Sequence, residues 1–312
     1  MKWGGMKSLS EKALGASSLL GGAFVVSTYG IWARFVSPMF SATAQTAIRC
    51  LLAAAIMVGT VWFSRKNRLT FKGYTKSQYL KIILLGLLTC GLALLFTFSV
   101  TSTKVGNTFS LIYAGSILTS FFVGVFALGE KTSYLKVCAV LVALGGLAMY
   151  GLNLTGLSIG IITGFSAGIC DGISNVIRKQ LRGVDRGVVV ICQYTVAGVC
   201  TLPLLLIGGG SNIKTVSLGA IIALIVYSIA SLGFGQLLLR GFSHFDVNVG
   251  GVILAMQIFF GMLLGYVLFH ETPSSSELLG SLLIFFAVIV AMGSESKVFK
   301  SVREKQVDVI HS

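Results

Sequence analysis

A few polar side chains interrupt the long apolar stretches of this sequence, and their types could support chemistry. Gln257 lies about ten residues into one apolar stretch, and Ser116 lies within another. Tyr113 precedes Ser116 by three residues, so on a helix the two side chains share a face. Asp171 and Asn175 have the i, i+4 spacing that also places two side chains together. Such groups can bind a polar solute, although Gln257 and Tyr113 could equally serve only packing between helices.

Three further polar residues allow two interpretations each. Arg49 lies some eight residues into an apolar stretch, where a lone arginine costs roughly 2.5–3.5 kcal/mol in a bilayer. It therefore either orients helices or meets a carboxylate on a substrate. Asn107 and Asn248 lie near the starts of their stretches and either cap helices or line entrances. Asp171 either attracts cations and relays protons or reaches toward Arg178 and the aqueous phase.

Motifs for catalysis, nucleotides and metals are missing from the sequence. It contains no HExxH, no GxSxG and no nucleotide-binding signature, and its histidines are His244, His270 and His311. None of the six cysteines forms a CxxC pair. We therefore expect neither an enzyme nor an ATP-driven pump, and no cofactor or metal site.

The composition predicts an integral membrane protein. Of its 312 residues 55% are hydrophobic and 11% are charged, whereas soluble domains carry about 25% charged residues. A spanning helix needs roughly 20 apolar residues. The sequence accordingly predicts an all-α fold of ten transmembrane helices, at 14–33, 41–63, 79–99, 105–128, 134–150, 157–177, 187–207, 216–238, 247–269 and 277–293.

The position of the basic residues predicts the orientation. The net charge of +14 lies in short loops and tails, which argues against a nucleic-acid partner. With the N-terminus inside, 20 of the 24 basic residues fall on the inner side. We therefore expect a multi-pass protein of the cell (cytoplasmic) membrane with both termini cytoplasmic. Its first helix would be a retained signal anchor.

An internal repeat predicts the architecture. Glu130 aligns with Glu271 at an offset of 141 positions, which also places Asn107 on Asn248 and Ser116 on Gln257. The chain then divides into a cytoplasmic segment 1–12, two five-helix repeats at 13–151 and 152–293, and a cytoplasmic tail 294–312. Because five is odd, the repeats enter the membrane in opposite senses, an inverted plan whose substrate site lies near the midplane.

Three segments carry a family resemblance. They are Arg49-Cys50-Leu51-Leu52-Ala53, Leu128-Gly129-Glu130-Lys131 and Phe269-His270-Glu271. With the chain length and the duplicated layout, they resemble the drug/metabolite transporter (DMT) superfamily, in particular its ten-helix EamA-type members. His270 departs from the pattern, because a glycine is usual at this position. The resemblance therefore does not determine the conformation of this turn, and His270 is a candidate titrating group.

The resemblance implies a central cavity lined mainly by the first, third, fourth, sixth, eighth and ninth helices. The fifth and tenth helices would lie at the periphery, where family members often form a homodimer. It also favours structural roles for Arg49, Glu130 and Glu271.

The predicted function is a secondary transporter of a small organic metabolite by alternating access. Family members move amino acids, nucleobases, amines and sugars, often by export. The substrate gradient, a coupling proton or another ion would supply the energy. The alternatives are a flippase for lipids or polyprenyl-linked lipids, a membrane enzyme, and a scaffold without transport.

Overall fold

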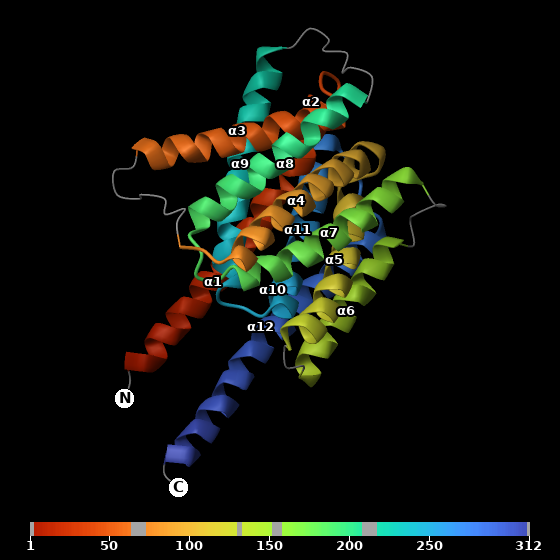
Figure 1. Cartoon of the computed structure of the whole chain (residues 1–312). Helices are drawn as coiled ribbons and strands as arrows, with labels where there is room; N and C mark the ends of the chain where they lie inside the picture. The colour runs from red at the N-terminus through yellow and green to blue at the C-terminus, as the bar shows by residue number, and fades with distance from the viewer. Residues whose placement is uncertain (1–2, 64–72, 130–132, 152–157, 208–216, 311–312) are drawn as a thin grey trace.

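The computed structural model describes residues 3–63, 73–129, 133–151, 158–207 and 217–310, and these residues form twelve helices (Figure 1). The helices are α1 (Trp3–Ser27), α2 (Tyr29–Val36), α3 (Ala42–Phe63), α4 (Lys76–Ser102), α5 (Val105–Leu128), α6 (Tyr134–Gly151), α7 (Ile159–Gln180), α8 (Arg186–Ile207), α9 (Leu218–Phe242), α10 (Val247–Leu254), α11 (Met256–Phe269) and α12 (Ser275–Ile310).

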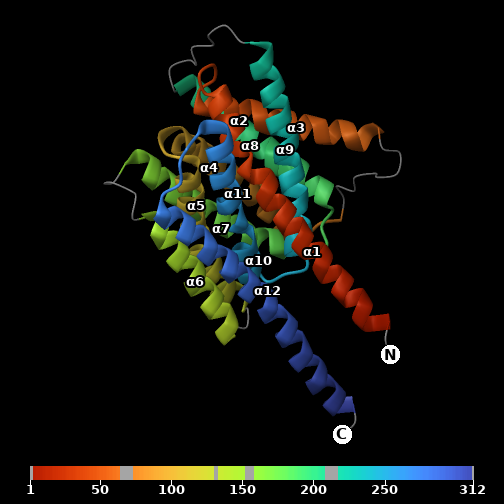
Figure 2. The same cartoon turned by 180° about the vertical axis from the view of Figure 1, so that it is seen from behind.

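The predicted all-α membrane fold is confirmed. Within the described part of the chain, nine stretches are long and apolar enough to cross a membrane, and α6 supplies a shorter apolar helix. The helix pairs α1–α2 and α10–α11 form the first and ninth spans. Both chain ends leave the bundle at one end, here called the terminal end, and α2 lies at the opposite, distal end (Figures 1 and 2).

Glycines bring α5 and α7 into direct backbone contact. A Cβ atom on Gly168 would lie 2.1 Å from the carbonyl oxygen of Ile112, and one on Gly115 would lie 2.6 Å from that of Phe165. Helices approach this closely only where side chains are small. This contact sets Asp171 of α7 against α5.

Two spans are interrupted beside the centre of the bundle. The first breaks at Thr28, whose hydroxyl donates to the Val25 carbonyl oxygen at 2.7 Å. A hydroxyl that bonds back into its own helix in this way tends to bend it. The ninth breaks at Ala255, two residues before Gln257. Discontinuous helices near the midplane are common at transporter binding sites.

The turn after each repeat's fourth span has the same geometry in both repeats. Gly129 ends α5 with φ 62° and His270 ends α11 with φ 53°, both in the left-handed region. The histidine therefore leaves the turn intact, at the cost of a conformation that side chains disfavour. Glu130, the predicted partner of Glu271, lies outside the described residues.

A capping box starts α12, as the spacing of Ser274 and Glu277 in the sequence favours. Ser274 N donates to Glu277 Oε2 at 2.7 Å, and Glu277 N donates to Ser274 Oγ at 3.3 Å, which confirms the capping box. Ser133 accepts from Lys136 N at 3.3 Å before α6, whereas Thr132 lies outside the described residues.

Candidate functional site

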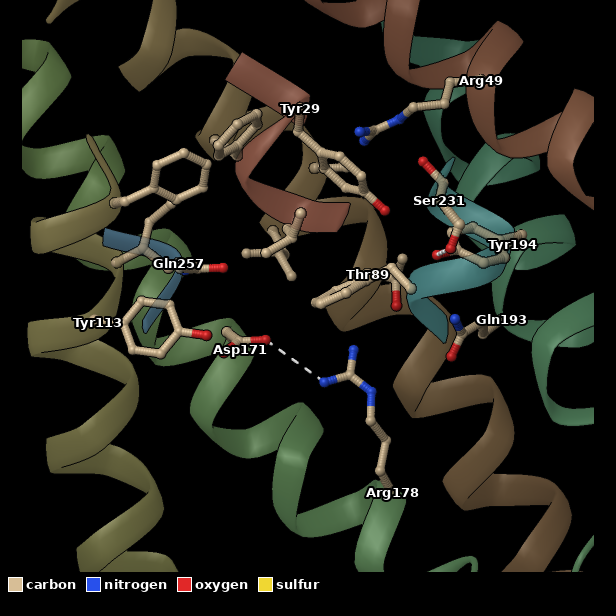
Figure 3. A pocket seen from close by; sticks show the side chains of 17 residues that line it. Tyr29, Arg49, Thr89, Tyr113, Asp171, Arg178, Gln193, Tyr194, Ser231 and Gln257 are labelled. Atoms are coloured by element: carbon tan, nitrogen blue, oxygen red, sulfur yellow. Dashed lines mark hydrogen bonds and ion pairs between the residues drawn. The ribbon is translucent and has the colours of Figure 1, made fainter. Parts of the chain in front are cut away.

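A central cavity of about 60 Å³ lies between the two repeats (Figure 3). Residues from α1, α2, α3, α4, α5, α7, α8, α9 and α11 line it. They are Val26, Tyr29, Arg49, Thr89, Leu92, Ala93, Phe96, Phe109, Ile112, Tyr113, Asp171, Arg178, Gln193, Tyr194, Ser231, Phe234 and Gln257. All six spans that the resemblance implied contribute lining residues, and the second span (α3) and the seventh span (α8) contribute as well. The fifth and tenth spans, α6 and α12, contribute no lining residue and pack on each other.

Asp171 is the centre of a buried polar cluster on one side of the cavity. Its carboxylate accepts hydrogen bonds from Ser116 Oγ at 2.8 Å and from Asn175 Nδ2 at 3.1 Å. The guanidinium of Arg178 lies 3.5 Å away and also donates to Asn175 Oδ1. Arg178 is 4% exposed and points into the bundle, so it is not the loop residue that the charge count assumed. The expected pairing of Asp171 with Arg178 is present, but it lies inside the protein.

Arg49 enters the cavity from the opposite side (Figure 3) and is also 4% exposed. Its guanidinium stacks on the rings of Tyr227, at 4.3 Å from the centroid, and Tyr29, at 5.5 Å. Its Nε atom has no hydrogen-bond partner, and no described carboxylate lies within ion-pair distance of it. Arg49 thus keeps its charge among aromatic faces without an acidic partner.

Buried oxygen atoms add unused hydrogen-bonding capacity to the lining. The Oε1 atoms of Gln257 and Gln193 have no hydrogen-bond partner in the protein, and neither has the Tyr29 hydroxyl. Because buried polar atoms are nearly always satisfied, such atoms around a cavity are candidate contacts for a solute.

The structure brings most of the predicted site residues together. Gln257, Tyr113, Asp171 and Arg49 line the cavity. Ser116 and Asn175 lie behind the lining and bind Asp171.

The two predicted asparagines lie elsewhere. Asn107 borders a small pocket at the distal end together with Glu271. Neither it nor Asn248 is a cap residue, because Lys104 and Asp246 occupy the N-cap positions of α5 and α10. The capping interpretation was therefore wrong.

Sequence reasoning missed six polar lining residues, Tyr29, Thr89, Arg178, Gln193, Tyr194 and Ser231. Gln193 lies inside a predicted span and carried the same signal as Gln257, but the seventh helix was not among those implied to line the cavity. Arg178 was assigned to a loop because it lies in the basic run at the end of its span.

An arginine closes the distal end of the bundle. Arg34 pairs with Glu271 at 2.6 Å and donates to the carbonyl oxygens of Val100 at 3.0 Å and Thr103 at 2.6 Å. Glu271 also accepts from Val105 N at 3.3 Å. This cluster links α2, the C-terminal end of α4, the start of α5 and the turn after α11.

The terminal end holds a basic basin of about 770 Å³. Arg182, Arg186, Arg240 and His244 are among its lining residues, and Arg178 borders both this basin and the central cavity. Arg178 is therefore a shared wall between the two spaces.

Beside the basin, Asp246 holds the start of α10. It pairs with Lys136 at 2.5 Å and with Lys179 at 2.7 Å. Burial by itself would raise the pKa of the Asp246 carboxyl, but the hydrogen bonds from these two lysines hold that pKa below its usual range.

The repeat relates the ion pairs at the two ends. Lys104 and Asp246 are the N-cap residues of α5 and α10 and lie 142 positions apart, one more than the repeat offset, and Glu277 lies 141 positions after Lys136. Lys104–Glu277, at 4.0 Å, is therefore the distal counterpart of Asp246–Lys136, with the charges exchanged.

Both the fold and the sequence of this chain have matches among known proteins. A crystal structure of a protein matches with a TM-score of 0.71 and 17% sequence identity, covering 90% of this chain and 96% of the other, which shows a shared fold. No curated protein matches the chain in sequence. The model of the EamA-like transporter family matches residues 13–152 and 158–293, one match for each repeat. The chain therefore belongs to the EamA-like transporter family, within the DMT superfamily.

Proposed function

We propose that this protein is a secondary transporter that moves a small organic metabolite across the cytoplasmic membrane by alternating access. Membership of a transporter family gives the class of activity. The central cavity supports the rest of the proposal, because both repeats line it and its polar groups are buried. Inverted-repeat transporters keep their substrates in such a place.

The observation that carries the proposal is that the buried central cavity is closed toward both ends by polar contacts between separate helices. The Arg34–Glu271 cluster joins four chain segments across the distal end. Toward the terminal end, Arg178 alone borders both the cavity and the basin. Opening toward the terminal side would then need a rotamer change of Arg178 together with release of the Asp246 pairs with Lys136 and Lys179.

The basic basin supports a cytoplasmic terminal end. Its arginines lie at the end where both chain termini leave the bundle (Figures 1 and 2). Short loops on the cytoplasmic side carry the excess of Lys and Arg. Asp171 is the acidic residue of the cavity and is the candidate for proton coupling.

The test is solute counterflow into proteoliposomes that contain the full-length protein. The panel consists of amino acids, nucleobases, quaternary amines and sugars, and the variant is Gln257→Ala. Because Oε1 of Gln257 has no partner in the protein, the variant breaks no internal hydrogen bond of that atom, and its melting temperature without solute measures the loss of packing separately. Loss of one hydrogen bond to the solute, about 1 kcal/mol, would raise its KM roughly five-fold.

The matched control is Gln236→Ala, which removes an amide that is not part of the cavity lining and contacts the Met57 sulfur at 3.8 Å. It should leave KM unchanged. Unchanged rate and affinity in Gln257→Ala would refute the central site, and absence of counterflow across the whole panel would refute metabolite transport.

A further inference from the structure

We infer that Arg49 is the carboxylate-binding residue of the cavity, and that the transported solute carries one carboxylate on a small apolar or aromatic body. This inference rests on the proposed function and narrows its substrate class. The charges of the lining, the unpartnered Nε of Arg49 and the apolar remainder of the cavity support it.

The charges that line the cavity do not cancel. Arg49, Asp171 and Arg178 are its charged lining residues. Asp171 and Arg178 lie 3.5 Å apart and neutralise each other. Arg49 then leaves one surplus positive charge, because a guanidinium does not lose its proton in proteins. A buried charge without a partner is costly, and a single carboxylate in the cavity would supply the missing counter-charge.

A comparison of two arginines separates ligand binding from helix orientation. In Arg34, all three nitrogen atoms are used, toward Glu271 and the carbonyl oxygens of Val100 and Thr103. Such bonds are expected of an arginine that fixes helices. Arg49 instead has a buried Nε without any partner, and its principal contacts are the ring faces of Tyr29 and Tyr227.

Stacking on ring faces does not use the N–H groups at the edge of the guanidinium, and Nε on this edge has no hydrogen-bond partner. A carboxylate binds to this edge through two parallel N–H···O bonds. Figure 3 shows the Arg49 guanidinium directed into the cavity beside the Tyr29 ring. The Tyr29 hydroxyl also has no partner in the protein and can add a third donor.

The remainder of the cavity suits a small apolar body. Phe96, Phe109, Phe234, Ile112 and Leu92 form much of the wall. The volume of about 60 Å³ accommodates several water-sized groups, since one water needs about 10–15 Å³. The Gln257 and Gln193 oxygen atoms can accept from an amino group if the solute carries one.

Two matched sets of four solutes test the inference by thermal unfolding of the purified full-length protein. The small set is propionate, propionamide, L-alanine and L-alaninamide. The aromatic set is 3-phenylpropionate, 3-phenylpropionamide, L-phenylalanine and L-phenylalaninamide. Within each set only the carboxylate and the amino group vary.

We expect carboxylate members of at least one set to raise the melting temperature while the corresponding amides do not. If only L-alanine or L-phenylalanine stabilises the protein, the cavity recognises an amino group in addition to the carboxylate. Equal stabilisation by acids and amides, or none by any acid, would overturn the inference.

Arg49→Met assigns the effect to this residue. It should abolish stabilisation by the acids, whereas Arg49→Lys should need at least ten-fold more acid for the same shift. Removal of the exposed charge in Lys76→Gln should change nothing. Without solute, Arg49→Met should melt no lower than the wild type, because the charge has no acidic partner. Acid stabilisation that persists in Arg49→Met would overturn the assignment.

The counterflow panel judges the proposed function separately. Counterflow of amines or sugars without any response to acids would refute the carboxylate inference and leave the transporter in place. Absence of counterflow for every solute would instead refute the proposed function.

Discussion

At the scale of single residues, His270 ends α11 in a backbone conformation that costs a residue with a side chain roughly 1 kcal/mol. Its side chain is exposed. Glycine adopts this conformation without strain, although it loses more entropy on folding. We therefore expect His270→Gly to stabilise the protein by roughly 0.5 kcal/mol, visible as a small rise in the melting temperature of the purified protein.

The other repeat supplies the matched control for this prediction. Gly129 has φ 62° at the corresponding position, and a Cβ atom there would meet nothing within 4 Å. Gly129→Ala should therefore destabilise the protein by roughly 1 kcal/mol through the backbone alone. A lower melting temperature for His270→Gly would mean that the imidazole itself contributes to the turn.

Single polar residues could be predicted where the bilayer makes them costly. Gln257, Tyr113, Asp171 and Arg49 stood out against apolar sequence, and all four line the cavity. Arg178 could not be identified as a lining residue from the sequence, because the direction of its side chain depends on how α7 ends and not on its neighbours in sequence. The lack of an acidic partner for Arg49 likewise became visible only with the helices in place.

At the scale of elements, the contact between α5 and α7 positions the cavity wall. The sequence spacing of Gly160, Gly164, Gly168 and Gly172 favours a close helix contact but does not identify the partner. Hydropathy located the spans well, because length and apolarity determine them. It could not locate the breaks at Thr28 and Ala255, since none of the three prolines lies near either break.

The α5–α7 contact predicts the effect of one added methyl group. In Gly168→Ala, the Cβ atom would lie 2.1 Å from the Ile112 carbonyl oxygen, so the helices must separate. Overpacking of this kind costs about 1–3 kcal/mol. We expect a clear loss of melting temperature together with reduced transport, because the separation also moves Asp171 away from Ser116.

The control for this helix contact is Gly233→Ala in α9, where an added Cβ atom meets nothing within 4 Å. Alanine is the better helix former, so this variant should be as stable as the wild type or more stable. If Gly168→Ala were equally well tolerated, the close approach of α5 and α7 would not be needed to hold the site.

At the scale of the whole molecule, the two repeats close the two ends with corresponding but unequal contacts. At the terminal end, Lys136 is buried and lies 2.5 Å from Asp246. At the distal end, the corresponding Lys104–Glu277 pair spans 4.0 Å, and the Lys104 side chain is 50% exposed. Exposed pairs contribute little to stability. Closure of the distal end must therefore depend mainly on Arg34 and Glu271.

This dependence predicts that Glu271→Gln shifts the protein toward a state open at the distal end. The variant removes the charge that Arg34 binds and weakens the bond to Val105 N. An added cysteine, Asn107→Cys, reports the opening, because residue 107 is buried beside Glu271. With a membrane-impermeant maleimide applied from outside, we expect labelling roughly ten times faster, equivalent to a shift of about 1.4 kcal/mol.

Two controls make this labelling experiment decisive. Lys104→Gln in the same Asn107→Cys background should leave the rate nearly unchanged, because its ion pair is long and exposed. The protein without the added cysteine measures the reaction of its six native thiols. If Glu271→Gln labelled no faster than Lys104→Gln, the Arg34–Glu271 pair would only shape the turn after α11. The distal closure would then depend on packing between the repeats.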